Sequence, residues 1–446
     1  MHDLLHTTAE RAAQYLDGLD KRGVAPAPEA LARLAELGGP LPDLPTDPAD
    51  VLALLDRVGS PATVASTGGR YYGVVVGGTL PAALAANWLA AAWDQNAATA
   101  VLSPVSAALE AIAQAWLLDL LGLPAESGVG FVTGATMANF SALAAARHAL
   151  LERAGWDVEA QGLFGAPPIT VVVGDEVHVS VLKALSLLGL GRERIVRVPV
   201  DGQGRMRPTA LPALAGPTIV CLQTGNVNSG ACDPADEICS IAHDAGAWVH
   251  VDGAFGLWLA AAPERAQLVR GIAGADSWAT DAHKWLNVPF DSGIAFVRDR
   301  EAHRAAISVT AAYLVQDAEG PREPMDWTIE FSRRARGLAV YATLRALGRD
   351  GVAELVDRLC ACAERFAAGL ADHGFEVLAQ DLNQVVVARG GDDETLATLA
   401  AVQADGTCYP SGTTWRGRRG IRLSVCNWQT TFADIDRSVA AMAAAA

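Results

Sequence analysis

The sequence predicts an α/β protein whose central sheet is mostly parallel. From about residue 60 to residue 300, short runs of β-branched and aromatic residues alternate with longer runs rich in Ala and Leu. The short runs are apolar at nearly every position, which is typical of strands covered by helices on both faces. Hydrophobic residues make up 51% of the chain and charged residues 19%, so the chain has enough apolar material for a large core.

Six runs are expected to be the strands of this sheet, and polar residues follow several of them. Ligands of parallel sheets bind beyond the carboxyl ends of the strands, so these polar residues are candidates for a site. The expected strands cover Gly130–Val132, Ile169–Val173, Ile195–Val200, Thr218–Leu222, Trp248–Val251 and Gly293–Val297.

Three parts are predicted, because 446 residues exceed a typical domain. Residues 1–60 read as helices joined by proline-rich turns. They are too short to bury a core and are expected to pack on a neighbouring unit or a partner subunit. Residues 61–300 are expected to be the large domain and residues 301–446 a smaller C-terminal α/β domain, with an amphipathic helix over 337–369. Short strands are expected there at Phe375–Leu378, Val385–Ala388 and Ile421–Val425.

The composition argues against several classes of protein. A net charge of −16 with no Lys/Arg block disfavours nucleic acid and anionic membranes as partners. The seven cysteines form no CxxC pair, so no metal site is predicted and free thiols in the cytoplasm are expected. The N-terminus lacks a signal-peptide pattern. The uncharged stretch Val74–Trp93 is long enough to span a bilayer, but its Gly, Pro and Ala residues favour a loop and a buried helix.

A lysine in the segment Thr280–Trp285, TDAHKW, is the first candidate for chemistry. Lys284 lies in an apolar-rich stretch between a histidine and a tryptophan. A lysine amine in such a setting can form an imine with an aldehyde. The alternative is a surface lysine whose aliphatic stem lies on the core.

Two further segments follow apolar runs. In HVDGA, Asp252 ends a run and small residues follow, so it could pair with a protonated pyridine nitrogen while Ala254 packs beneath the ring. The alternative for Asp252 is a helix N-cap. In GDEVHVS, His178 could stack on an aromatic cofactor, or it could be a structural histidine.

A fourth segment, Thr133–Asn139, is a turn of small residues before an Ala-rich helix. Free N–H groups at a helix N-terminus bind phosphate, and threonine hydroxyls add donors. Together the four segments supply a phosphate cradle, a stacking imidazole, an acid for a pyridine nitrogen and an imine-forming lysine. This combination predicts pyridoxal 5'-phosphate (PLP) as the cofactor.

The segments GFVTGATMAN, DEVHVSVLKA, HVDGAFG and DSWATDAHKWLNVPFDSG resemble the group II pyridoxal-dependent decarboxylases, which include the aromatic-L-amino-acid and glutamate decarboxylases. The separation of 32 residues between Asp252 and Lys284 is also similar. The resemblance implies PLP-dependent transferase fold type I, which is aspartate-aminotransferase-like. It also implies a homodimer that is interlocked by the N-terminal segment, with active sites at the subunit interface.

The resemblance also implies roles for individual residues. Lys284 would carry PLP as a Schiff base, Asp252 would pair with the ring nitrogen, and His178 would stack on the ring. Ala254 would pack below the ring, and His283 would lie beside the phosphate. The phosphate loop would consist of Thr133, Gly134, Ala135 and Thr136.

This sequence departs from the family pattern on the substrate side. The family's loop tyrosine, which protonates the substrate carbon, would fall near Pro324, and the nearest upstream tyrosine is Tyr313. Val227 replaces a common threonine, for which Asn226 or Asn228 could substitute. The residues expected to contact the substrate are Tyr72, Asn96 and Tyr313.

The predicted reaction is α-decarboxylation of an L-amino acid through an external aldimine and a quinonoid. The missing tyrosine leaves two alternatives on the same scaffold, namely oxidative deamination to an aldehyde and Cα–Cβ cleavage by a lyase or aldolase. A non-catalytic PLP-fold protein is a further alternative. Arg422 could bind a substrate carboxylate or form a structural ion pair. The sequence does not indicate the side chain of the substrate.

Overall fold

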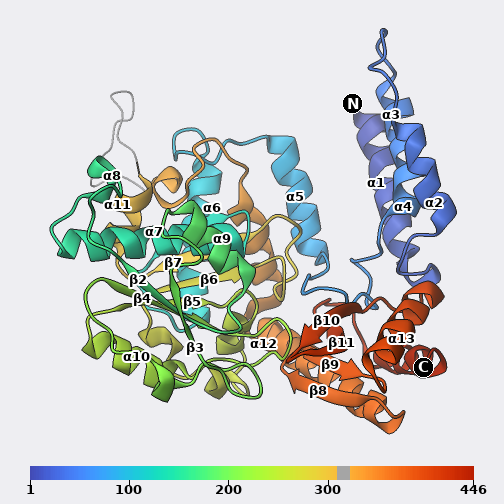
Figure 1. Cartoon of the computed structure of the whole chain (residues 1–446). Helices are drawn as coiled ribbons and strands as arrows, with labels where there is room; N and C mark the ends of the chain where they lie inside the picture. The colour runs from blue at the N-terminus through green and yellow to red at the C-terminus, as the bar shows by residue number, and fades with distance from the viewer. Residues whose placement is uncertain (309–321) are drawn as a thin grey trace. The chain divides into compact units, whose positions relative to one another are not determined.

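The computed structural model describes residues 1–308 and 322–446, which divide into two compact units (Figure 1). One unit consists of Thr79–Ala361 and Ala379–Gln384 and contains the seven-stranded sheet. The other consists of Met1–Gly78, Cys362–Leu378 and Val385–Ala446 and contains most of a four-stranded sheet.

The seven-stranded sheet has the order β1-β7-β6-β5-β4-β2-β3. The five strands from β3 to β6 are parallel to their neighbours, whereas β7 runs antiparallel to both β6 and β1. The prediction of a mostly parallel sheet is therefore confirmed. The strands are β1 (Gly128–Val132), β2 (Thr170–Gly174), β3 (Ile195–Val198), β4 (Thr218–Gln223), β5 (Trp248–Asp252), β6 (Ser277–Asp281) and β7 (Gly293–Val297).

Helices cover both faces of this sheet. In Figure 1, α7 (Ala135–Arg153) and α9 (Val179–Leu187) lie above the sheet and α10 (Ala235–Asp244) lies below it. The side chains between α7, α9 and the strands form a core of Ala, Val and Leu residues that are almost fully buried. Burial of this kind explains why most of the strands are apolar, and the partly exposed strand β3 at the edge, which contains Arg197, is the exception.

Among the residues that the structure describes, this unit contains four further α-helices and most of a fifth, α12, whose last residues belong to the other unit. The long helix α12 is kinked at Gly348, where φ is 63°. Within the described part of the chain, no helix is sufficiently long and apolar to cross a membrane. These helices are α5 (Pro81–Trp93), α6 (Pro104–Leu120), α8 (Val158–Gln161), α11 (Arg300–Ile307) and α12 (Arg336–Asp372).

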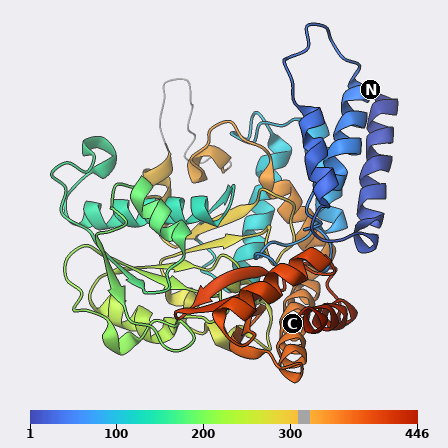
Figure 2. The same ribbon diagram turned by 45° about the vertical axis from the view of Figure 1, so that its right-hand side comes forward.

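In the other unit, the N-terminal segment packs with the C-terminal strands. Val24 N donates to the carbonyl of Gly406 at 2.9 Å, and the rings of Tyr71 and Tyr409 stack at 5.9 Å. The N-terminal helices lie side by side in Figures 1 and 2. They are α1 (His2–Asp17), α2 (Pro28–Ala32), α3 (Pro48–Leu54) and α4 (Ser60–Ala62).

The smaller sheet has the order β10-β11-β9-β8, and two helices accompany it. Strands were expected at three of these four places, and β10 is the addition. The elements are β8 (Glu376–Asp381), β9 (Gln384–Ala388), α13 (Asp392–Asp405), β10 (Ser411–Trp415), β11 (Arg418–Ser424) and α14 (Phe432–Ala444).

Candidate active site

The candidate site lies where neighbouring strands of the large sheet end. Asp252 is the last residue of β5 and Asp281 is the last residue of β6. The two strands are parallel, with Asp252 opposite Ala279, and Asp281 N donates to the carbonyl of Ala254 at 2.9 Å. The two carboxylates therefore project from the same edge of the sheet, where ligands of parallel sheets bind.

Lys284 lies three residues after the end of β6 and is half-buried. Its Nζ atom is 3.0 Å from Oδ2 of Asp281, and its side chain is 18% exposed. The carboxylate of Asp281 is almost fully buried, and its Oδ1 atom lies 3.4 Å from Nε2 of His283. A lysine held in this way by a buried acid is not an extended surface lysine, and its amine remains within reach of a small ligand.

The same Asp281 carboxylate contacts the loop before α7. The backbone N–H of Ala135, the first residue of α7, donates to Asp281 Oδ1 at 2.5 Å. Asp281 thus joins the lysine to the predicted phosphate loop. Asp281 was not among the predicted site residues. The available signal was its position three residues before Lys284, at the end of an apolar segment.

Close packing against a glycine fixes the position of the loop before α7. Gly293 is paired with Val132 on one side and with Asp281 on the other. A Cβ atom at Gly293 would lie 2.4 Å from Cα of Gly134, so a larger residue would push the loop away. The N-terminus of α7 and the half-buried Thr133 and Thr136 form a cradle of donors suited to a phosphate.

Asp252 is a buried carboxylate without a cation. It is 4% exposed, and its Oδ1 accepts the backbone N–H of Ala254 at 3.3 Å. None of the residues that the structure describes forms an ion pair with it. An unpaired buried carboxylate is costly, and the protonated pyridine nitrogen of PLP would supply the missing positive charge. The residues present therefore fit this cofactor.

Ser180 connects His178 to Asp252, because its hydroxyl contacts both side chains. The Nδ1 atom of His178 caps α9 by accepting the backbone N–H of Ser180 at 3.2 Å. The hydroxyl of Ser180 is 2.7 Å from the same Nδ1 atom and 3.4 Å from Oδ2 of Asp252. A small cavity lies against both His178 and Asp252.

His283 is held on the loop side of Lys284. Its Nδ1 atom accepts the backbone N–H of Ser292 at 3.2 Å, and its ring lies 4.4 Å from that of Phe290. Burial lowers the pKa of His283, which favours the neutral ring. The buried hydroxyl of Ser292 has no hydrogen-bond partner among the described residues, so it is a further candidate donor that the sequence did not indicate.

The residues predicted on the substrate side have internal contacts. Asn96 Nδ2 donates to Ser332 Oγ at 3.2 Å, and its Oδ1 accepts from the backbone of Ala98 and Arg333. Tyr72 is fully buried, and its hydroxyl lies 3.4 Å from Ser438 Oγ. Tyr313 lies outside the described residues. A role for these three in substrate binding stays a prediction.

Asn226 and Arg422, which are also candidates on the substrate side, form hydrogen bonds within the protein. Asn226 Oδ1 accepts the backbone N–H groups of Asn228 and Ser229, which closes a turn. Arg422 is half-buried and donates to the carbonyl of Gly73 at 3.3 Å. Burial lowers the pKa of Arg422, and none of the described acidic residues pairs with it.

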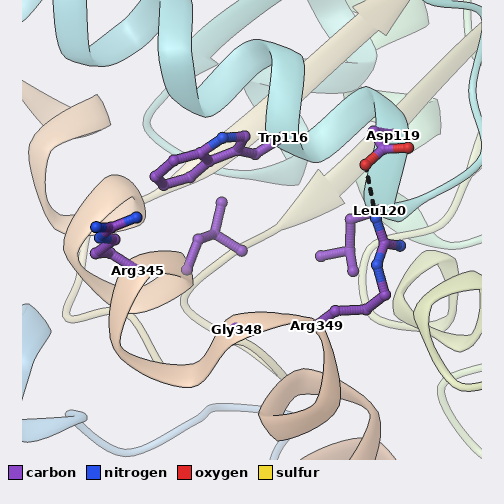
Figure 3. A pocket seen from close by; sticks show the side chains of 7 residues that line it. Trp116, Asp119, Leu120, Arg345, Gly348 and Arg349 are labelled. Carbon is purple, nitrogen blue, oxygen red and sulfur yellow. Dashed lines mark hydrogen bonds and ion pairs between the residues drawn. The ribbon is translucent and has the colours of Figure 1, made fainter.

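A separate hollow of about 300 Å³ lies between α6 and α12 (Figure 3). Figure 3 shows Trp116, Asp119, Arg345 and Arg349 around it, and Arg349 pairs with Asp119 at 2.6 Å. None of its lining residues belongs to the site around Lys284.

Known proteins are similar to this chain in sequence and in fold. The pyridoxal-dependent decarboxylase conserved domain matches residues 72–389. L-2,4-diaminobutyrate decarboxylase of Rhizobium meliloti is 31% identical over 420 residues, which cover 88% of this chain and 81% of that protein. Phenylacetaldehyde synthase of Arabidopsis thaliana is 27% identical over 73% of this chain and 71% of that protein. The crystal structure of Oryza sativa TDC with PLP and tryptamine superposes with a TM-score of 0.89 at 22% identity, covering 99% of this chain and 97% of that one.

The fold is the α/β PLP-dependent transferase fold type I, as the sequence predicts. The chain belongs to the pyridoxal-dependent decarboxylase family. It is a PLP-dependent carboxy-lyase that acts on an amino acid.

Proposed function

We propose that the chain releases carbon dioxide from the α-carboxylate of an L-amino acid at the site formed by Lys284, Asp252 and His178. The observation that carries this proposal is the buried carboxylate of Asp252. It lacks a cation among the described residues and projects from the strand next to the one that leads to Lys284. A pyridinium nitrogen is the partner that this carboxylate requires.

The residues around the cofactor have separable tasks. When bound, PLP supplies an aromatic ring that accepts the electron pair left by the departing carboxylate. The Nζ atom of Lys284 is the attachment point, and Asp281 holds that amine in place. Asp252 keeps the pyridine nitrogen protonated, and Ala254 leaves room below the ring. The N-terminus of α7, with Thr133 and Thr136, binds the phosphate, and neutral His283 adds a donor beside it.

His178 has two tasks in this proposal. Ser180 at the start of α9 holds the Nδ1 edge of the ring, so the ring would be in place to stack on the cofactor when PLP is bound. Its other edge can guide a proton to the substrate carbon. This second task matters because Pro324, near the place expected for the family's loop tyrosine, is a buried residue that opens a short 3-10 helix.

The absence of a tyrosine near Pro324 also favours a second candidate function. Without that acid, the substrate carbon could meet another fate. Molecular oxygen could oxidise it after carbon dioxide is lost, and water would then release ammonia and leave an aldehyde and hydrogen peroxide, or the Cα–Cβ bond could be cleaved instead. The similarity to a phenylacetaldehyde synthase is compatible with the aldehyde-forming reaction.

One experiment separates these functions. Purified, PLP-loaded enzyme is mixed with a panel of L-amino acids while carbon dioxide, ammonia and peroxide are measured together. The panel begins with L-2,4-diaminobutyrate, the substrate named for the 31% identical relative, and includes aromatic and acidic amino acids. Carbon dioxide without peroxide supports simple decarboxylation, and Lys284→Ala serves as the inactive control. No carbon dioxide from any amino acid would overturn the proposal.

The assembly and location are part of the same proposal. We infer a cytoplasmic homodimer with active sites shared between subunits. Large apolar side chains exposed on α5 and after it support a partner surface there, since such patches mark interaction sites. These side chains are Trp88, Leu89, Trp93, Val101, Leu102 and Val105. None of the seven cysteines forms a disulfide in the described part of the chain, and six are buried, which fits a reducing compartment.

A further inference from the structure

A chain of buried hydrogen bonds leads through the large unit to His178. It begins at Trp248 in β5, whose Nε1 donates to Ser277 Oγ at 2.9 Å. Ser277 Oγ lies 2.9 Å from His250 Nδ1, and His250 Nε2 lies 2.9 Å from Asn139 Oδ1. Asn139 Nδ2 donates to Ser180 Oγ at 3.3 Å, and Ser180 Oγ is 2.7 Å from His178 Nδ1.

The direction of the hydrogen bonds follows from the groups that can act in one way only. An indole N–H only donates, so Ser277 Oγ accepts from Trp248, and an amide oxygen only accepts, so His250 Nε2 donates to Asn139 Oδ1 and Nδ1 accepts from Ser277. Full burial lowers the pKa of His250 to about 3, so its ring is neutral and the single ring proton is on Nε2. That proton is donated to Asn139 Oδ1, which leaves the amide N–H₂ of Asn139 facing Ser180.

Ser180 therefore accepts from Asn139 and has one proton to donate. Two acceptors are within reach, His178 Nδ1 at 2.7 Å and Asp252 Oδ2 at 3.4 Å. The shorter contact is the stronger hydrogen bond. The backbone N–H of Ser180 also points at His178 Nδ1, which therefore carries no proton. Both donors of Ser180 thus converge on one nitrogen of His178.

We propose that Ser180 is a positioning residue of the PLP site, whose hydroxyl and backbone N–H fix the ring proton of His178 on Nε2. The ring proton is then always at the edge away from α9, where it serves as a donor to the reacting substrate. Without the hydroxyl, Nδ1 loses the shorter of its two hydrogen bonds from Ser180, and the other tautomer and other ring orientations become more accessible. This inference rests on the proposed role of His178 in the site.

The test uses PLP-loaded enzyme labelled with ¹⁵N in its nine histidines. The nitrogen signals of His178 are identified by their loss in His178→Gln. We expect the wild type and Ser180→Thr, which keeps the hydroxyl, to show the Nε2–H tautomer of His178. We expect Ser180→Ala to show a mixture of tautomers, a kcat lower by about tenfold as for one lost hydrogen bond, and a KM within twofold of the wild type.

The matched control is Ser141→Ala. Ser141 is fully buried on α7, two residues from Asn139, and its hydroxyl has no hydrogen-bond partner among the described residues. This variant should leave the His178 signals and kcat unchanged. The inference is overturned if Ser180→Ala keeps a single Nε2–H tautomer, or if Ser141→Ala changes the His178 signals equally. The nitrogen spectrum can be read even if no carbon dioxide is released, so this failure is distinct from failure of the proposed reaction.

Discussion

Asp281 and Lys284 form an ion pair in which Oδ2 of the carboxylate lies 3.0 Å from Nζ of the amine. The other carboxylate oxygen accepts the backbone N–H of Ala135 at 2.5 Å. One buried side chain therefore neutralises the lysine and also holds the start of α7, where the phosphate is expected to bind. The lysine and the phosphate loop are 149 residues apart in the sequence, and Asp281 fixes their relative position.

Because Asp281 contacts both groups, two substitutions of this residue should lower the free energy of unfolding by different amounts. Asp281→Ala leaves the Lys284 ammonium and the Ala135 N–H without their partner. We expect it to lower the free energy of unfolding of the cofactor-free protein by about 1–3 kcal/mol. Asp281→Asn keeps an oxygen that can accept the backbone N–H of Ala135, so its free energy of unfolding should fall by less. Urea unfolding followed by circular dichroism measures both, and equal losses for the two variants would contradict the contact with Ala135.

Asp252→Asn removes the negative charge that the pyridine nitrogen needs. We expect PLP to remain bound through Lys284 and the phosphate loop, while kcat for carbon dioxide release falls by about 100-fold or more, as for other lost electrostatic stabilisers. The control is Asp119→Asn, an exposed acid paired with Arg349 at the separate hollow (Figure 3). It should retain full activity. If Asp252→Asn kept wild-type kcat, Asp252 would not be the partner of the ring nitrogen.

Much of the fold could be predicted from the sequence, but the strand that leads to Lys284 could not. The other strands of the large sheet have runs of Val, Ile and Phe, whereas β6 reads Ser-Trp-Ala-Thr-Asp. All five residues of β6 are buried because β5 and β7 pair with it on either side. That protection comes from strands that are distant in sequence, so the local pattern of β6 carries little signal.

In the candidate site, too, the sequence predicts residues within local motifs but not residues whose contacts join distant parts of the chain. The segments around Lys284, Asp252 and His178 have residue patterns that indicate their chemistry. The residues that connect these segments do not, because the contacts join distant positions. Ser180 reaches Asp252 across 72 residues and Ala135 reaches Asp281 across 146. Serine and aspartate are common at helix starts and strand ends, so their types alone did not single them out.

Gly293→Ala should weaken cofactor binding without changing the chemistry of any functional group. The new Cβ atom would lie 2.4 Å from Gly134 Cα and 2.7 Å from Gly134 N, so the phosphate loop must shift. We expect the dissociation constant for PLP to rise about tenfold or more, which corresponds to a loss of at least about 1.4 kcal/mol. Gly391→Ala is the control, because a Cβ there meets no atom within 4 Å. Equal PLP affinity in the two variants would show that the loop tolerates the added methyl group.

Charges on the exposed apolar surface of α5 should prevent dimerisation. Trp88 and Trp93 are 47% and 44% exposed, so the double substitution Trp88→Glu, Trp93→Glu should leave each chain folded. We expect analytical ultracentrifugation to give a dimer for the wild type and a monomer for this variant, because charged residues are unfavourable in the centre of an interface. Phe164→Glu is the control, since Phe164 is 99% exposed but lies outside that surface. A dimer in both variants would place the subunit contact elsewhere.

The burial of His250 and His303 should lower the free energy of unfolding in mild acid. Burial lowers the pKa of both His250 and His303 from the ordinary 6.5 to about 3. Below pH 6.5 the unfolded chain binds a proton at each of these residues, whereas the folded chain binds none until about pH 3. The stability that depends on neutral histidine is therefore complete above pH 6.5 and decreases as the pH falls towards 3.

His250→Gln should remove part of this pH dependence. Each histidine contributes up to about 1.4 kcal/mol of stability per pH unit between these limits, so the variant should show a shallower fall between pH 6.5 and pH 4.5. His303 still titrates in the variant, so some slope remains. Urea unfolding at several pH values measures the effect, with the exposed His6→Gln as the control. An unchanged slope in His250→Gln would mean that His250 is already protonated in the folded protein, contrary to its hydrogen bonds to Ser277 and Asn139.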